Sequence, residues 1–146
     1  MADHYSTTSF SIDTTNHEFL QDLVAIFSAY ENENIKDAPE WFQIVFDNKK
    51  FDILESTGID CHPEKDSLWI TSEYYVNVFT IADIIQAALN HYDLDIYVGF
   101  QVAHTCSKLY TDVFGGTGVF ITKNKIEIFD TASWLESKIQ EYQSKD

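Results

Sequence analysis

The chain has 146 residues, of which 45% are hydrophobic and 15% aromatic. This composition favours a single folded domain over residues 1–146, because it can bury enough apolar surface to offset the entropy cost of ordering the chain. The 24 Asp and Glu residues outnumber nine Lys, there is no Arg, and the net charge is −15. Such a surface repels phosphates, so we expect no direct binding of nucleic acid or of a membrane.

No apolar run approaches the roughly 20 residues of a membrane span, and the first residues lack the pattern of a secretory signal. We therefore expect a cytoplasmic protein. The two cysteines, Cys61 and Cys106, are too few for a disulfide framework in a chain of this length, and we expect free thiols. The oligomeric state stays open at this level.

The first elements follow from hydrophobic spacing. Residues 1–14 are expected to form an N-terminal arm, with weak strand-like alternation over residues 9–12. A helix with one buried stripe is predicted over residues 16–31, because apolar residues recur there at helical spacing, namely Phe19, Leu20, Leu23, Val24, Phe27 and Tyr30. Thr15 and Glu18 have the spacing of a capping box at its start.

The middle of the chain changes period. Apolar runs on both sides of a polar turn predict a hairpin over residues 44–54, and Gly and Pro predict a loop over residues 56–67. Short strands are predicted at 68–71 and 75–78. A second helix with a clear apolar stripe is predicted over residues 81–92, and Thr80 with Asp83 can cap its start.

The last third begins with a strong alternating strand over residues 94–104. Residues 119–122 and 126–129 predict a hairpin, and a third helix is predicted over residues 132–142. An offset of 50 residues aligns 76–92 with 126–142. Internal duplication of a β-rich and helical unit and chance similarity both stay open, because unrelated strand–helix units share this patterning.

The hairpins predict an α+β fold, in which about three helices pack on a mainly antiparallel sheet. The apolar stripes predict which helical side chains pack against the sheet, namely Leu23, Phe27, Ile85, Leu89, Leu135 and Ile139.

The most unusual stretch is Gly115, Gly116, Thr117 and Gly118, which holds three of the five glycines. Its spacing matches neither a Walker loop nor a dinucleotide-binding fingerprint. Two interpretations remain. The glycines belong to a hairpin or bulge between strands, or they form a loop that contacts a ligand or a partner.

The same region carries a resemblance. His-Thr-Cys-Ser-Lys at 104–108, continued by Phe-Gly-Gly-Thr-Gly-Val-Phe-Ile-Thr at 114–122, resembles a segment of uncharacterised proteins of bacteria and their phages and plasmids. The similarity extends over about residues 60–135. No activity is attached to this group, so no catalytic residue carries over. The resemblance implies an accessory protein of a phage or plasmid.

Two thiols and two imidazoles make a weak candidate zinc site, namely Cys61, His62, His104 and Cys106. On a strand His104 and Cys106 would point to the same face, whereas the adjacent Cys61 and His62 would diverge. The paired Cys-x2-Cys spacing of structural zinc sites is absent. We expect neither a metal nor another cofactor.

A thiol- or metal-dependent hydrolase is the alternative of a different class. Cys106 would be its nucleophile, with His104 beside it, His62 or His91 as base and Asp112 to orient the base. A free Cys is more often a small buried apolar residue, and we expect no catalytic residue here.

Acidic residues concentrate in the first half, because residues 1–66 hold 14 of the 24 acids and four of the nine Lys. A surface rich in carboxylates attracts basic proteins and can compete for a groove that binds phosphates. The candidate partner-binding residues are Glu31, Glu33, Asp37, Glu40, Asp47, Asp52, Glu55, Asp60, Glu64 and Asp66.

The preferred hypothesis is an acidic protein that binds and inhibits a basic, nucleic-acid-handling protein, such as a host defence nuclease targeted by a phage or plasmid. An acidic immunity or adaptor protein, and a surface whose charge only maintains solubility, are the alternatives.

Overall fold

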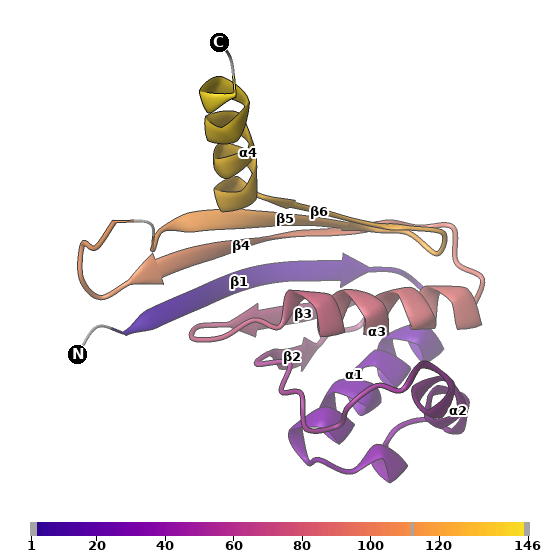
Figure 1. Cartoon of the computed structure of the whole chain (residues 1–146). Helices are drawn as coiled ribbons and strands as arrows, with labels where there is room; N and C mark the ends of the chain where they lie inside the picture. Colours follow the sequence, from indigo (N-terminus) through magenta and orange to yellow (C-terminus); the bar gives the residue numbers. More distant parts are fainter. Residues whose placement is uncertain (1–2, 112, 145–146) are drawn as a thin grey trace.

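The computed structural model describes residues 3–111 and 113–144, and its strands form one sheet in the order β2-β3-β1-β4-β5-β6 (Figure 1). Every pair of neighbouring strands is antiparallel. The elements in chain order are β1 (His4–Asp13), α1 (His17–Glu31), the short 3-10 helix η1 (Ile35–Asp37), α2 (Glu40–Lys49), β2 (Asp60–Pro63), β3 (Ser67–Ser72), α3 (Val78–His91), β4 (Val98–Cys106), β5 (Gly115–Ile121), β6 (Ile126–Asp130) and α4 (Thr131–Gln143).

The first four strands follow the β-α-β-β-α-β connectivity of a ferredoxin-like, split βαβ unit. Strand β3 lies between β1 and β2, and β1 lies between β3 and β4. Helix α2 is inserted after α1, and β5, β6 and α4 follow the unit. This topology supports many unrelated functions, so it leaves the function open.

Helices α1, α2 and α3 lie on one side of the sheet (Figure 1). Alternate residues of the strands face them, so Phe10 and Ile12 of β1 are buried and Phe10 stacks on Phe100 of β4 at 4.3 Å. The opposite face, here called the open face, has no helix layer in Figure 1. The predicted α+β class with an antiparallel sheet is confirmed.

Two predicted helices carry the core. Leu23 of α1 and Leu89 of α3 have no solvent exposure, and Phe27 and Ile85 are buried beside them. Both helices begin one to three residues from the expected caps. Asn16 caps α1 in place of Thr15, and Asn77 caps α3 in place of Thr80 with Asp83. Each Asn side chain accepts the backbone N–H group at the third helical position.

The hairpin expected over residues 44–54 is wrong, because residues 40–49 form α2. Its apolar residues Trp41, Phe42, Val45 and Phe46 have helical spacing, and the contacts of Phe46 with α1 and of Trp41 with α3 favour the helix. Lys50 ends it in the left-handed region, at φ 55°.

Four other expectations are corrected. The arm expected over residues 1–14 holds β1, an interior strand whose signal is weak because only two large apolar residues alternate with Ser and Thr. The loop expected over 56–67 contains β2. Residues 75–77 lead into α3 rather than forming a strand, and β4 begins at Val98 rather than at residue 94.

Helix α4 forms as predicted, with Asp130 as its cap, but its expected packing is wrong. Leu135 is 52% and Ile139 47% exposed, and no described residue of α4 is buried. The helix projects away from the α1–α3 layer (Figure 1). The 50-residue duplication is not matched either, because 126–129 is a strand whereas 76–79 is a loop and a helix start.

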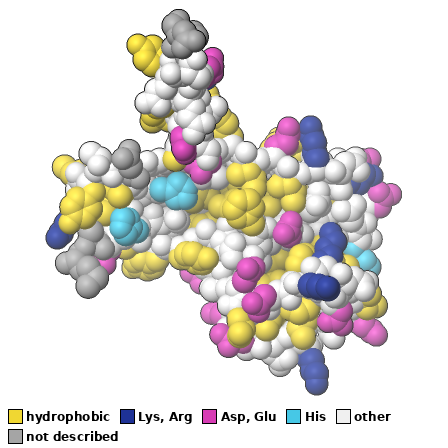
Figure 2. All heavy atoms as spheres, in the orientation of Figure 1, with side chains coloured by type: hydrophobic (Ala, Val, Ile, Leu, Met, Phe, Trp, Pro, Cys, Tyr) yellow, Lys and Arg dark blue, Asp and Glu magenta, His cyan; other side chains and the backbone are white. Residues whose placement is uncertain are grey.

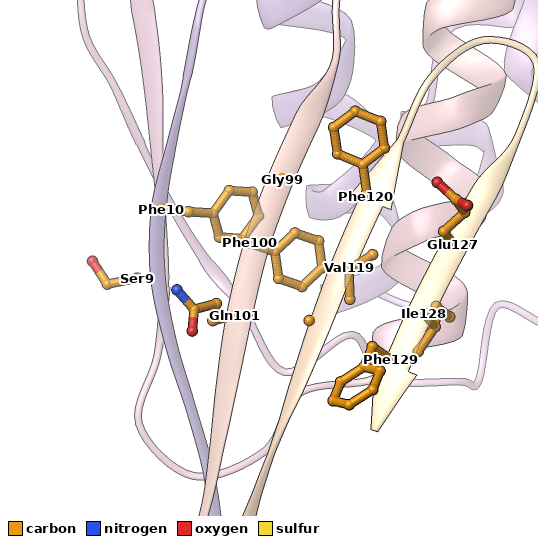
Figure 3. Close-up of a pocket in the computed structure, with 11 residues that line it drawn as sticks. Ser9, Phe10, Gly99, Phe100, Gln101, Val119, Phe120, Glu127, Ile128 and Phe129 are labelled. Carbon is orange, nitrogen blue, oxygen red and sulfur yellow. The ribbon is translucent and has the colours of Figure 1, made fainter. Parts of the chain in front are cut away.

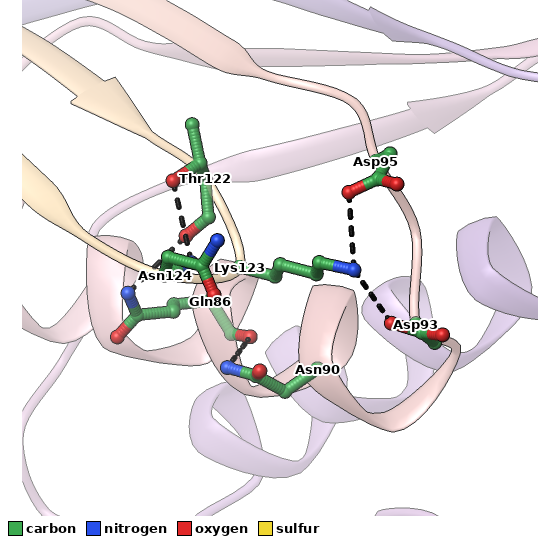
Figure 4. Close-up of polar contacts among 7 residues, drawn as sticks. All are labelled: Gln86, Asn90, Asp93, Asp95, Thr122, Lys123 and Asn124. Atoms are coloured by element: carbon green, nitrogen blue, oxygen red, sulfur yellow. Dashed lines mark hydrogen bonds and ion pairs between the residues drawn. The ribbon is translucent and has the colours of Figure 1, made fainter.

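The β5–β6 hairpin is confirmed, and its turn is tied to the end of α3 (Figure 4). Lys123 Nζ lies 2.7 Å from Asp93 and 3.0 Å from Asp95, and Gln86 donates to the Thr122 carbonyl at 3.2 Å. These contacts fix the outer half of the sheet on the helix layer. Within the described residues, none of the helices has the length and apolarity that crossing a membrane requires.

Candidate protein-interaction surface

The four candidate zinc ligands do not converge. His104 and Cys106 lie on β4, while Cys61 and His62 lie on β2, with β3 and β1 between them. Three strand spacings amount to about 14 Å, far beyond the reach of one metal ion. No group of three or more metal-binding side chains occurs among residues 3–111 and 113–144.

Both nitrogens of His104 already have hydroxyl partners. Nδ1 lies 3.1 Å from Ser6 Oγ and Nε2 lies 2.8 Å from Thr117 Oγ1, so the imidazole bridges β1 and β5 across β4. The ring therefore stabilises the sheet at this end. A role as a ligand or a base would require one of these bonds to break.

The proposed partners of Cys106 in a hydrolase are not brought to it. His91 stacks on Trp41 at 4.2 Å, at the end of α3, and the His62 ring lies against Trp69, with centroids 4.6 Å apart and planes tilted by 37°. Asp112 lies outside the described residues. Burial raises the pKa of the other thiol, Cys61, to about 12, with smaller contributions from Asp60 and Glu31, so this thiol stays protonated at neutral pH.

Of the two interpretations of Gly115–Gly118, the contact loop is wrong, because these residues begin strand β5 and pair with β4. The sequence could not distinguish the two, since a glycine run suits either. Gly115 lies beside the first residue of α4, and a Cβ on it would be 2.9 Å from Thr131 Oγ1. Gly118 lies on the open face, where a Cβ would meet nothing within 4 Å.

All ten candidate acidic residues are exposed. Glu64 and Asp66 lie in the β2–β3 turn, and Asp66 pairs with His17 at 2.8 Å. The other eight lie around α2, the end of α1 and the start of β2, a region here called the acidic end, which consists of Glu31, Glu33, Asp37, Glu40, Asp47, Asp52, Glu55 and Asp60. Figure 2 shows acidic side chains gathered over the lower part of the molecule, where these elements lie.

The carboxylates of the acidic end are largely uncompensated. Among the ion pairs of the described residues, none involves these eight side chains, although three lysines occur in the same part of the sequence. Their charges therefore act on an approaching molecule without being neutralised at contact distance.

The loop between α2 and β2 holds part of the acidic end in a fixed shape. Asp52 accepts the Leu54 backbone N–H at 2.9 Å, and Glu55 accepts the Thr80 hydroxyl of α3 at 2.8 Å. The Thr57 carbonyl accepts the Asn77 backbone N–H at 3.1 Å. The loop is thus bonded to the start of α3 at two points.

Gly58 explains why this loop needs a glycine. Its φ is 78°, in the left-handed region, and a Cβ there would lie 2.1 Å from the Tyr75 carbonyl oxygen. The sequence marked Gly58 only as a loop signal.

A hollow of about 230 Å³ opens in the acidic end, between the end of α1 and the loop. Glu31, Glu33, Asp60 and Tyr30 are among the residues that line it. The Tyr30 side chain is 2% exposed, and its hydroxyl has no hydrogen-bond partner among the described residues. A buried hydroxyl without a partner is uncommon in a folded protein.

The surroundings of Tyr30 are strongly negative. Burial raises the pKa of the Tyr30 hydroxyl above its ordinary value, and the carboxylates of Glu55, Asp83 and Asp52 raise it further. The pKa of Asp83 is also raised, mainly by burial. The nearby Lys49 lowers this pKa in part, and the Glu55 carboxylate raises it. The sequence indicated Asp83 only as a helix cap and Tyr30 only as a core residue. Their proximity to the loop between α2 and β2 arises only in the folded chain.

Comparison of the chain with models of protein families, with curated proteins and with solved structures gave no match.

Proposed function

We propose that this protein binds a basic, nucleic-acid-handling protein through its acidic end and thereby competes with nucleic acid for the partner's binding groove. The observation that carries the proposal is the hollow, which Tyr30 lines together with the exposed carboxylates of Glu31, Glu33 and Asp60. These carboxylates are hydrogen-bond acceptors, and none of them has an ion-pair partner among the described residues.

The donor would come from the partner. A Lys or Arg side chain that enters the hollow donates N–H bonds to the carboxylates of Glu31 and Asp60. Proteins that bind nucleic acid present such side chains along their grooves, since they are the groups that bind phosphates.

The remaining acids supply long-range attraction. With a net charge of −15, the chain raises the rate of encounter with a basic surface and repels nucleic acid itself. Occupation of the groove then excludes nucleic acid, which is the action of an inhibitor. A phage or plasmid protein directed against a host nuclease is the concrete form that agrees with the resemblance of the 104–122 region.

The proposal is tested by capture from a nuclease-treated bacterial lysate on the immobilised protein, with elution by the polyanion heparin. We expect a nucleic-acid-binding protein to be captured, to be eluted by heparin, and to be missing when the bait carries Glu31→Lys with Glu33→Lys.

The matched control bait carries Asp13→Lys with Glu73→Lys, two exposed acids outside the acidic end, of which Asp13 ends β1 and Glu73 directly follows β3. It makes the same change in net charge, so it should still capture the partner. Capture that survives reversal at the acidic end, or that is lost equally with the control bait, would contradict the proposal.

A further inference from the structure

Helix α4 presents an apolar stripe with no covering element in the described chain. The stripe is defined by four side chains that are about half exposed or more, namely Trp134, Leu135, Ile139 and Tyr142. Phe114, 47% exposed, lies beside it and lines a groove along the helix with Trp134 and Leu135. A helix of this kind buries its stripe against another surface in most folded proteins.

The open face of the sheet presents a second apolar surface. A depression of about 720 Å³ crosses β1, β4, β5 and β6, and Gly99, Gly118, Phe120 and Phe129 are among the residues that line it. Figure 3 shows Phe120 and Phe129 on its β5–β6 side. The two phenylalanines are exposed, as is Tyr97, which stacks on Phe120 at 5.5 Å.

The stripe cannot cover the depression of its own chain. Asp130 is the last residue of β6 and Thr131 is the first of α4, so no loop separates strand from helix. The helix therefore continues away from the strand end, as Figure 1 shows, and has no linker with which to fold back over the sheet.

Charge does not oppose contact at this place. Glu127 is the only charged residue among the eleven that line the depression. Glu127 itself pairs with Lys125 at 3.4 Å. In a chain with a net charge of −15, an area with this single carboxylate allows a second copy to approach with little repulsion.

We propose that two copies of this chain form a twofold dimer, in which the α4 stripe of each copy lies in the open-face depression of the other. The 13 residues of α4 span about 20 Å, enough to cross four strands that lie about 14 Å apart from first to last. Both partner surfaces belong to the same chain, as a closed twofold interface requires.

The available area suits a stable dimer. The eight exposed side chains of the stripe and the depression are Trp134, Leu135, Ile139, Tyr142, Phe114, Phe120, Phe129 and Tyr97. With about 200 Å² for each large side chain and half of it exposed, they offer roughly 800 Å² per copy, the size of a standard interface.

Sedimentation velocity at micromolar concentration tests the proposal. Wild type should sediment with twice the 16.8 kDa mass of one chain. Leu135→Glu with Ile139→Glu should give a monomer, whereas Ser137→Glu with Gln140→Glu, with the same added charge on the polar side of α4, should stay dimeric.

Gly118→Lys tests the sheet side. The fold accepts this residue, since a Cβ there meets nothing within 4 Å, so the variant should be a folded monomer by circular dichroism. Asn48→Lys on α2 adds the same charge away from the depression and should stay dimeric.

Mixing the two monomeric variants distinguishes the arrangement. A mixed pair keeps one intact contact, between the stripe of the Gly118→Lys chain and the depression of the other, so the mixture should associate where neither variant does alone. Stripe-to-stripe pairing would leave Gly118→Lys dimeric, and monomeric wild type would leave the two surfaces to another protein. Either result overturns the proposal.

The salt dependence separates the dimer from partner binding. Salt should strengthen the dimer by screening repulsion between the two copies, whereas it should weaken partner binding at the acidic end. The failure of one proposal is therefore distinguishable from the failure of the other.

Discussion

The indole N–H of Trp41 donates a hydrogen bond of 2.8 Å to the Asp22 carboxylate, which joins α2 to α1. The hydroxyl of Tyr92, just after α3, donates to the same oxygen. The Trp41 ring also stacks on His91. One carboxylate thus connects all three helices of the layer that carries the acidic end.

Replacing Asp22 by Ala should lower the free energy of unfolding by about 1–3 kcal/mol, because two partly buried donors lose their acceptor. Asp22→Asn keeps an acceptor oxygen and should cost less. Asp95→Ala, at an exposed ion pair, should cost under about 1 kcal/mol. Urea denaturation measures all three, and equal losses for Asp22→Ala and Asp95→Ala would contradict the role of this connection.

Gly58→Ala should destabilise the fold by about 1–3 kcal/mol, because φ is positive and the new Cβ would overlap the Tyr75 carbonyl. Gly116→Ala is the control, since its Cβ would make an ordinary contact at 3.6 Å. That change should alter stability by less than about 1 kcal/mol. A Gly58→Ala variant as stable as the control would mean that the loop between α2 and β2 has another shape.

Helix α3 belongs to the hydrophobic core, whereas α4 does not. Leu89→Ala should cost about 2–5 kcal/mol, because the side chain is fully buried. Leu135→Ala, introduced into the monomeric Gly118→Lys background, should cost less than about 1 kcal/mol, since Leu135 is half exposed in a single chain. Similar losses at the two sites would place α4 against the core after all.

Tyr30→Phe removes a buried hydroxyl that has no partner, so stability at neutral pH should stay the same or increase. The folded-state pKa of Tyr30 is raised, so the unfolded chain loses this proton first as pH rises. Wild type therefore loses stability above about pH 10, the ordinary tyrosine value, and the Phe variant should lose less. Urea denaturation at neutral and alkaline pH measures the difference. A loss of more than about 1 kcal/mol at neutral pH would mean that the hydroxyl has a partner.

Strong periodicity identified α1, α3 and the β5–β6 hairpin, because each has one buried face and polar turns on both sides. It failed for α2, where Ile44, Val45 and Phe46 are consecutive and fit a strand or a helix equally. It also failed for β1, where small polar residues weaken the alternation of Phe10 and Ile12. In both cases tertiary contacts decide the structure, and no local pattern records them.

The apolar stripe of α4 shows a different limit. Spacing correctly identified Leu135 and Ile139 as one face, but it cannot tell whether the same chain covers that face. Likewise, the acids were recognised from composition, whereas the hollow around Tyr30 depends on α1 meeting the 51–60 loop. The zinc candidates failed because strand order, which places β2 three positions from β4, cannot be read from ligand types.

The most direct test of the central claim is the affinity of the captured partner, measured by isothermal titration at low and high salt. Glu31→Lys with Glu33→Lys should weaken binding by at least about tenfold at low salt. Tyr30→Phe, which removes a buried hydroxyl, and Asp13→Lys with Glu73→Lys should have little effect. Duplex DNA should displace the protein from the partner. An affinity that changes neither with salt nor with the charge reversal of Glu31 and Glu33 would contradict the proposed function.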